Sequence, residues 1–440
     1  MTGTDSPTPG HDGTLPLWPA PQPSGPLDAT VEVPGSKSLT NRYLVLAALA
    51  DGPGRLRAPL RSRDSLLMVA ALRQLGARVD DDPNQPGDWV VTPGPVRGGA
   101  QVDCGLAGTV MRFLPAVAAL GDGPVTFDGD PGARVRPMGP VLHALRDLGA
   151  DVVETGEPGF LPFRVTGGPA VHGGQVSVDA SGSSQFVSGL LLTGARLPEG
   201  LTVQHVGATL PSLPHIEMTV AALRAAGVRV DDTTPGTWRV EPGPIAARDV
   251  RVEPDLSNAA PFLCAAVVAG GTVRVPGWPT HTTQPGGLLP GILERMGARC
   301  SLDGDVLSVT GDGRPRGIDL DLSAAGEIAP TIAAVATVAE GRTVLRGIAH
   351  LRGHETDRLA ALRTEITRLG ARAEETADGL IIDPAPLRPA VVRSYADHRM
   401  ATFGALIGLA VPGVQVEDVA TTSKTIPDFT GLWNAMLVRG

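Results

Sequence analysis

Two lysines are the most informative basic residues of this sequence. Lys37 and Lys424 are the only lysines in the chain, whereas arginine occurs 35 times. A bias toward arginine codons explains the low lysine count. The few positions that keep a lysine despite this bias are therefore informative. Lysine is a compact cation that can release a proton, whereas the guanidinium of arginine holds its proton throughout the physiological range. The two lysines are therefore candidates for proton transfer.

Other polar residues stand where helix-like apolar runs begin. The motifs PGSKS (34–38), GT (108–109), SSQ (183–185) and DHR (397–399) directly precede or open such runs. Five arginines occur at or just after helix starts: Arg42, Arg112, Arg136, Arg358 and Arg399. Each motif alone is typical of ordinary N-capping, but cations oppose the helix dipole, which favours anions at this end. Their recurrence predicts one basic pocket for small anions in a chain of net charge −9.

The elements that must position these residues follow a sixfold repeat. An apolar helix-like run, a glycine turn and a short strand recur, with turn glycines 69 to 77 residues apart at Gly54, Gly123, Gly200, Gly271, Gly341 and Gly413. A second helix with a tag such as LRQLGARV (72–79) and then a hairpin follow. Each unit is therefore predicted as strand, helix, strand, helix, strand, strand. Because the first helices are apolar all round, we expect them to be buried in two lobes of three units rather than stacked in a solenoid.

Composition excludes several classes of protein. The 440 residues are ample for a large core, and the acidic balance with only 15 aromatic residues disfavours nucleic-acid binding. Cys104, Cys264 and Cys300 lie too far apart for a disulfide framework or a zinc motif, which fits a cytoplasmic protein. No apolar stretch reaches membrane length and no signal peptide is visible. Residues 1–26, rich in Pro, Gly, Ser and Thr, are predicted to be a flexible tail.

Seven motifs together carry a resemblance to a known family. They are PGSKSLTNR (34–42), LAGTVMR (106–112), RPM (136–138), SSQF (183–186), HETDR (354–358), DHRMA (397–401) and SKTIPDF (423–429). In this order they resemble the 5-enolpyruvylshikimate-3-phosphate synthase family, from about Trp18 to the C-terminus. The resemblance implies an α/β (α+β) protein with the enolpyruvyl transferase fold, a two-lobed inside-out α/β barrel of six βαβαββ units. Two crossover strands, near Gly35 and Glu253, would join the lobes.

The lobes implied by this resemblance are discontinuous in sequence. Residues 27–35 and 253–440 would form the first lobe, residues 36–252 the second, and the active site would lie in the cleft between them. The implied reaction transfers the enolpyruvyl group of phosphoenolpyruvate to the 5-hydroxyl of shikimate 3-phosphate through a tetrahedral adduct, in the pathway to chorismate and the aromatic amino acids. No metal, cofactor, nucleic acid or membrane would take part, and the enzyme would be a cytoplasmic monomer.

The resemblance also implies roles for individual residues. Shikimate 3-phosphate would be held by Lys37, Ser38, Arg42, Ser183, Ser184, Gln185, Ser212, Glu327 and His354. Phosphoenolpyruvate would be held by Lys37, Gly108, Arg136, Gln185, Arg358, Arg399 and Lys424. Glu327 would be the general base on the 5-hydroxyl, and the two lysines would move protons. Glu355 would either take part in proton transfer at C3 or cap a helix.

Five positions depart from patterns of the family. Leu106 replaces an asparagine, Glu327 an aspartate and His354 a lysine, while His350 stands where some members have asparagine and His215 where an aromatic hydroxyl is sometimes found. A sister enzyme that acts on UDP-N-acetylglucosamine is an alternative. In that enzyme the corresponding lysine is followed by asparagine and a loop carries a reactive cysteine, whereas here residue 38 is serine and residues 128–137 contain no cysteine. A non-catalytic protein that binds phosphorylated ligands is a second alternative, and it would be expected to lose the acid and base groups.

Overall fold

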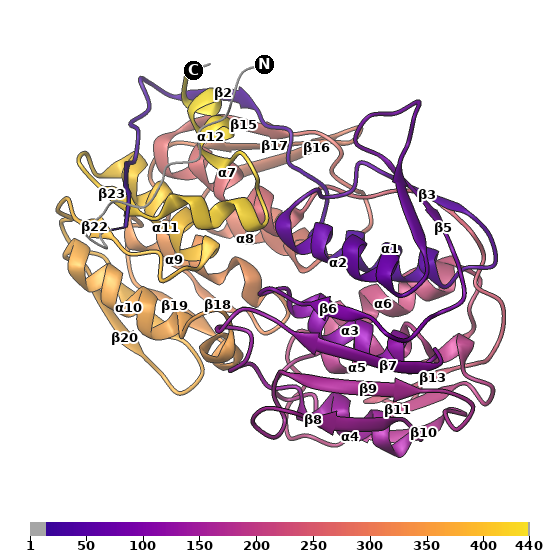
Figure 1. The fold of residues 1–440 in the computed structure, drawn as a ribbon. Coiled ribbons are helices and arrows are strands. Elements are labelled where there is room, and N and C mark those ends of the chain that lie inside the picture. The colour runs from indigo at the N-terminus through magenta and orange to yellow at the C-terminus, as the bar shows by residue number, and fades with distance from the viewer. Residues whose placement is uncertain (1–14, 439–440) are drawn as a thin grey trace.

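The computed structural model describes residues 15–438, which form six small β-sheets and twelve α-helices (Figure 1). Residues 1–14, the larger part of the predicted tail, lie outside the described residues. Five sheets have four strands, in which one parallel pair is followed by an antiparallel hairpin. This is the strand arrangement that the repeat predicts.

The strands, given in their order across each sheet, are as follows. The sheets of the first three units are β14 (Asp249–Arg251), β3 (Gly54–Arg57), β5 (Trp89–Thr92), β4 (Arg78–Asp81); β6 (Gln101–Asp103), β7 (Gly123–Asp128), β9 (Phe163–Gly167), β8 (Asp151–Glu154); and β10 (Gly174–Val178), β11 (Leu201–His205), β13 (Thr237–Val240), β12 (Val230–Asp231). Those of the last three are β2 (Leu27–Thr30), β15 (Gly271–Val275), β17 (Val306–Gly311), β16 (Arg299–Asp303); β18 (Asp319–Asp321), β19 (Thr343–Arg346), β21 (Leu380–Asp383), β20 (Arg372–Glu375); and β22 (Val391–Val392), β23 (Gln415–Glu417), β1 (Leu17–Pro19).

The helices alternate between a first and a second type. The first helix of each unit is α1 (Lys37–Ala48), α3 (Gly108–Ala118), α5 (Gln185–Leu191), α7 (Leu256–Ala269), α9 (Ala329–Thr337) and α11 (His398–Ala410). The second is α2 (Arg63–Gln74), α4 (Gly139–Asp147), α6 (Leu213–Ala225), α8 (Leu289–Arg295), α10 (Arg358–Leu369) and α12 (Phe429–Val438). Short 3₁₀ turns are η1 (Gly194–Arg196), η2 (Pro285–Leu288), η3 (Gly326–Ile328), η4 (Ala349–Gly353) and η5 (Val419–Lys424).

The first and fourth units exchange their leading strands. The strand β14 follows the third unit in sequence, yet it pairs in parallel with β3 of the first unit, and β2 pairs in parallel with β15 of the fourth unit. The two connections meet where Gly35 bridges Pro254, and Ser36 N donates to Glu253 O at 2.8 Å. The chain therefore passes twice between its two halves at one place.

The sixth unit lacks the final hairpin, and the N-terminal segment replaces it. β1 pairs antiparallel with β23, with Trp18 opposite Val416, and the Trp18 ring lies edge-on to Phe429 at 6.2 Å. The prediction of a flexible tail is therefore wrong for residues 15–26. The missing hairpin leaves one edge of β23 unpaired, and a short strand bounded by prolines can cover such an edge although its composition is typical of a tail.

Each half of the molecule has an apolar core of its own. The first core contains buried residues between Leu44 and Ile245, and the second contains Ala20–Val31 together with buried residues between Leu256 and Leu437. The first-type helices are buried along nearly their whole length, α7 and α11 among them, as their composition predicts. In Figure 1 the sheets lie around these helices. Two such cores are compatible with the predicted lobe boundaries.

Within residues 15–438, no helix combines the length and the apolar character that crossing a membrane requires.

Candidate active site

A cavity lies where helices of both halves begin. The starts of α1, α3 and α5 face those of α7, α10 and α11 across it, so residues far apart in sequence share its wall. The predicted site residues that line it are Lys37, Ser38, Gly108, Arg136, Ser183, Ser184, Gln185, Ser212, Glu327, His354, Glu355, Arg358, Arg399 and Lys424. Among the predicted residues only Arg42 is absent from this wall.

Arg42 lies beneath the cavity instead. Its guanidinium is buried, with Nη1 donating to Ser38 O at 2.9 Å, Nε to Thr219 Oγ1 at 2.7 Å and Nη2 to His215 O at 2.9 Å. The ring of Phe113 lies 5.3 Å from it. Arg42 is one turn into α1 and these donors bind the protein itself, and its implied contact with shikimate 3-phosphate stays a prediction. It holds the carbonyl of Ser38 and the first turn of α6.

Lys37 is held at the start of α1 by acidic residues that sequence reasoning missed. Ser36 caps the helix, with its hydroxyl accepting from Leu39 N at 3.4 Å. The backbone N–H of Lys37 donates to Asp255 Oδ2 at 3.2 Å, and its Nζ lies 3.4 Å from Asp64 Oδ2. Asp64 is buried near the start of α2. Its position in the motif RSRD (61–64) of a second-type helix is the only signal that the sequence offered.

Gly108 opens α3 at a point where a side chain has no room. A Cβ built there would lie 2.9 Å from Arg136 Nη2 and 3.0 Å from Gln185 Oε1. Arg136 donates to Leu106 O at 2.9 Å, and Arg112, a second arginine on this wall, donates to Gln185 Oε1 at 2.9 Å. A backbone carbonyl therefore orients Arg136 at the position where the family often has asparagine. Burial lowers the pKa of Arg136 and of Arg112, as expected for cations without a carboxylate partner.

Glu327 stands among cations on the opposite wall. Its Oε2 lies 3.5 Å from Arg358 Nη1 and 3.8 Å from Arg399 Nε, and its Oε1 lies 3.9 Å from His354 Nδ1. Burial would raise the pKa of Glu327, but the charges of Arg358 foremost and then of Arg399 hold that pKa well below its usual range. The carboxylate is therefore ionised, and it accepts only weak, long contacts that a substrate can replace.

His354 is neutral in this cavity. Burial and the charge of Arg358 lower the pKa of His354 to about 3. Its Nδ1 lies 3.3 Å from Arg358 Nη1, which can only donate, so Nδ1 accepts and the proton is on Nε2. His350 stacks edge-on to it with centroids 5.7 Å apart, and burial lowers the pKa of His350 as well. Where the family often has a lysine, this chain therefore presents an uncharged donor.

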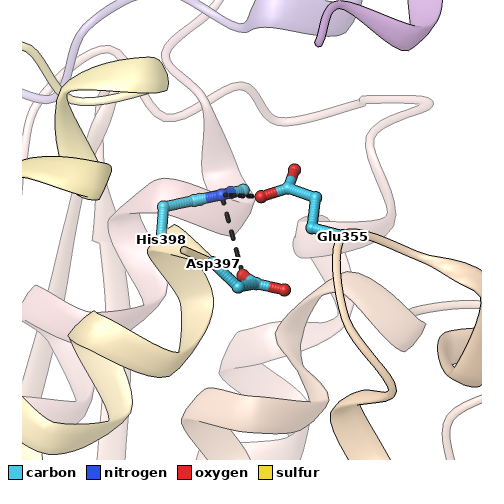
Figure 2. Close-up of side chains that lie close together, drawn as sticks. All are labelled: Glu355, Asp397 and His398. Atoms are coloured by element: carbon cyan, nitrogen blue, oxygen red, sulfur yellow. Dashed lines mark hydrogen bonds and ion pairs between the residues drawn. The ribbon is translucent and has the colours of Figure 1, made fainter. Parts of the chain in front are cut away.

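Glu355, His398 and Asp397 form a chain of polar groups, in which the Glu355 carboxylate points at the His398 ring (Figure 2). Glu355 Oε1 lies 2.5 Å from Lys424 Nζ, and Oε2 lies 3.1 Å from His398 Nδ1. Asp397 accepts from Arg358 Nε at 2.8 Å. The helix cap of α10 is Asp357, which accepts from Ala360 N at 3.1 Å. The alternative that Glu355 caps a helix is therefore wrong, because the capping residue lies two positions later and α10 begins at Arg358.

The same three residues have the donor types of a metal site, since their ligand atoms lie within 4.8 Å of one another. Both carboxylates, however, already face a cation, Lys424 on Glu355 and Arg358 on Asp397. A divalent ion would have to enter against these two charges. The residues present therefore do not fit a metal.

Comparisons with known proteins identify the family of this chain. The family model described as EPSP synthase (3-phosphoshikimate 1-carboxyvinyltransferase) matches residues 21–433. A protein of Kocuria rhizophila named 3-phosphoshikimate 1-carboxyvinyltransferase is 58% identical over 427 residues, which cover 95% of this chain and 96% of that one. Two solved structures of EPSP synthase from Acinetobacter baumannii are 26% identical, with TM-scores of 0.78 and 0.76, over 95% of this chain and 97% of theirs.

Proposed function

Because the chain belongs to the EPSP synthase family and catalyses carboxyvinyl transfer to 3-phosphoshikimate, we propose that the cavity between its halves is where this reaction takes place. The reaction moves the enolpyruvyl group of phosphoenolpyruvate to the 5-hydroxyl of shikimate 3-phosphate and releases phosphate, in the shikimate pathway. The assignment of the site rests on the position of Glu327. Its carboxylate lies within 4 Å of Arg358 and Arg399, in a cavity that is also lined by both lysines.

Phosphoenolpyruvate binds on the cationic side of this cavity. Arg136 and Arg399 can each bind a carboxylate or a phosphate through their guanidinium groups. Arg358, whose Nε and Nη2 donate to Asp397, offers Nη1. The bare backbone at Gly108 lets the ligand approach α3 closely. Lys37 and Lys424 add point charges from the two halves. A small molecule with one carboxylate and one phosphate matches this set of donors.

Shikimate 3-phosphate binds on the side rich in hydroxyls. Ser183, Ser184 and Ser212 line this side together with Gln185 and Ser38. Hydroxyls and an amide can bind both a phosphate and ring hydroxyls. Arg42 contributes from beneath by holding the carbonyl of Ser38. His354 offers its Nε2 proton, so it binds a ring hydroxyl as an uncharged donor where a lysine would bring a charge.

Glu327 removes the proton from the 5-hydroxyl as that oxygen attacks C2 of phosphoenolpyruvate. In the empty cavity Glu327 is a weak base, because Arg358 and Arg399 hold its pKa low. Once phosphoenolpyruvate binds these arginines, its negative charges offset theirs, and the pKa of Glu327 rises toward the range of a useful base. The base therefore becomes competent only once phosphoenolpyruvate is bound.

Lys424 supplies the proton that C3 gains in the addition step. Its ammonium is paired with Glu355 at 2.5 Å, and the carboxylate is in turn held by His398. In the elimination step the same groups take a proton back from C3 and phosphate leaves. Lys37, held by Asp64, donates to the departing phosphate.

Neither alternative considered from the sequence fits as well. Action on UDP-N-acetylglucosamine is disfavoured by the 58% identical relative, whose name gives 3-phosphoshikimate as the acceptor. A non-catalytic binding protein would not need Glu327, Glu355 and both lysines in the same cavity.

The organisation of the molecule completes the proposal. The lobes are residues 27–35 with 253–438 and residues 36–252, and the two apolar cores support this division. Residues 15–26 belong with the first of these lobes, because β1 pairs with β23 and Ala20 is part of its core. The enzyme acts as a monomer, since one chain supplies both walls of the cavity. It acts in the cytoplasm, which agrees with the free thiols of Cys104, Cys264 and Cys300 within the described residues.

Phosphate release from phosphoenolpyruvate tests the acceptor directly, with shikimate 3-phosphate in one reaction and UDP-N-acetylglucosamine in a parallel one. We expect release only with shikimate 3-phosphate. Release only with the nucleotide sugar would contradict the assignment of the acceptor. Release in neither reaction, from protein with a cooperative thermal transition, would favour the non-catalytic alternative.

A further inference from the structure

The segment that presents the DHR motif has a strained backbone. Tyr395 and Ala396 both have φ of 55°, the left-handed region that side chains other than glycine rarely adopt. They directly precede Asp397, His398 and Arg399, and the turn is closed by Asp397 N donating to Ser394 O at 2.9 Å. Two successive strained residues persist only where the surrounding structure holds them.

A buried carboxylate of α10 holds this turn. The Tyr395 hydroxyl donates to Glu365 Oε1 at 2.6 Å, and Arg393 N donates to Glu365 Oε2 at 3.3 Å. Glu365 is fully buried, and Arg368 on the same helix supplies its counter-charge at 3.0 Å. Burial and the bond to Glu365 raise the pKa of Tyr395 to about 12, so its hydroxyl keeps the proton that it donates.

The same helix holds the other end of the turn. Arg358, two helical turns before Glu365, donates to Asp397 at 2.8 Å, and Asp397 caps α11 by accepting from Arg399 N at 2.8 Å. Arg399 then reaches across to Ser257 O at 2.7 Å. Arg358 and Glu365, on one face of α10, therefore bind the strained turn at both of its ends. The orientation of Arg399 depends on these contacts.

We propose that Tyr395 and Glu365 are positioning residues for the phosphoenolpyruvate side of the cavity. Neither is among the residues that line the cavity, so they act through the turn. Without the phenol hydroxyl, the turn can relax to ordinary backbone angles, which rotates His398 and Arg399 away from their present directions. This inference rests on the proposed role of Arg399 in binding phosphoenolpyruvate.

The variant Tyr395→Phe tests the inference with little change in volume. We expect the KM for phosphoenolpyruvate to rise about tenfold, the effect of losing one hydrogen bond to a charged group. The KM for shikimate 3-phosphate should stay unchanged, because its serine contacts come from the other half. Arg363→Gln is the matched control, since Arg363 lies on the same helix but pairs with Glu375 rather than with Glu365 or Tyr395. It should leave both KM values unchanged.

A second variant separates positioning from general destabilisation. Glycine adopts a φ of 55° without strain, so Ala396→Gly added to Tyr395→Phe should recover most of the KM for phosphoenolpyruvate. Equal rises of both KM values, or an unchanged KM in Tyr395→Phe, would overturn the inference. Arg399→Lys separates the binding role of Arg399 from the positioning role of Tyr395 and Glu365. If it raises the KM for phosphoenolpyruvate while Tyr395→Phe does not, only the positioning role is wrong, and if neither raises it, the role of Arg399 is wrong as well.

Discussion

Lys424 Nζ lies 2.5 Å from Glu355 Oε1, although the two residues belong to different units and are 69 positions apart. Glu355 also accepts from His398, so its carboxylate joins an ammonium to an imidazole. Burial would raise the pKa of Glu355, but His398 and Lys424 hold that pKa well below its usual range. The ionised carboxylate therefore holds the Lys424 side chain at the cavity wall, where a proton donor must lie.

Replacing Lys424 by arginine should separate charge from proton transfer. Lys424→Arg keeps the cation and an ion pair with Glu355, but arginine does not release its proton. We expect kcat to fall about 100-fold or more, while the KM for phosphoenolpyruvate changes little. Steady-state kinetics of phosphate release measures both values. A kcat near that of the unmodified enzyme would contradict the proton-transfer role of Lys424.

Adding one carbon at Gly108 should affect one substrate. In Gly108→Ala the new Cβ meets Arg136 and Gln185, so the guanidinium must move. We expect the KM for phosphoenolpyruvate to rise about tenfold to 100-fold, with a small change for shikimate 3-phosphate. Gly182→Ala is the matched control, because Gly182 lines the same cavity but its Cβ would meet only Phe186, at 3.9 Å. Equal effects of the two substitutions would argue against this steric reason.

Neutral His354 should make the ligand-free protein sensitive to acid. Its pKa is about 3 in the folded protein and about 6.5 when unfolded, so between these values the unfolded state binds the extra proton. Stability is therefore complete above about pH 6.5 and falls as the pH drops toward 3. The loss is at most about 1.4 kcal/mol per pH unit, and less here because 29% of the side chain is exposed.

Chemical denaturation at several pH values tests this expectation. In His354→Gln the free energy of unfolding should decline less steeply between pH 6.5 and 4 than in the unmodified protein. Curves that stay parallel for the two proteins would show that His354 is not the group that titrates.

Arg42 should contribute strongly to the stability of the fold, because its guanidinium is buried beneath the cavity. In Arg42→Lys one ammonium replaces a guanidinium that binds two backbone carbonyls and a threonine hydroxyl. At least one buried partner is left without a donor, and we expect a loss of about 2 to 4 kcal/mol in the free energy of unfolding. Urea denaturation measures it. A loss below about 0.5 kcal/mol, the usual range for surface substitutions, would contradict the role of Arg42 beneath Ser38.

Much of this architecture follows from patterns local to the sequence. The six helix runs and their glycines repeat at nearly constant spacing, so the units and the burial of their first helices were predictable. The helix-start motifs predicted the cavity because every unit brings the same end of its helix to one place. Glu327, Lys37 and Lys424 meet there as expected.

What escaped prediction depends on contacts between distant segments. β1 pairs with β23 across almost the whole sequence, and no local pattern encodes that pairing. Asp64 faces Lys37 only because α1 and α2 pack side by side. Arg42 belongs to a motif predicted to bind the ligand, and the sequence did not reveal that its Nη2 donates to His215 O at the start of α6. A motif thus identifies a residue more readily than it identifies the direction of the side chain.

The most direct test of the central claim is Glu327→Gln, measured by phosphate release and by calorimetric binding of shikimate 3-phosphate to the same protein. The amide is isosteric with the carboxylate but cannot take a proton. The account predicts that release falls by about 100-fold to 10,000-fold, while shikimate 3-phosphate binds within a few-fold of its original affinity. Release at an unchanged rate, with binding intact, would contradict the assignment of Glu327 as the base.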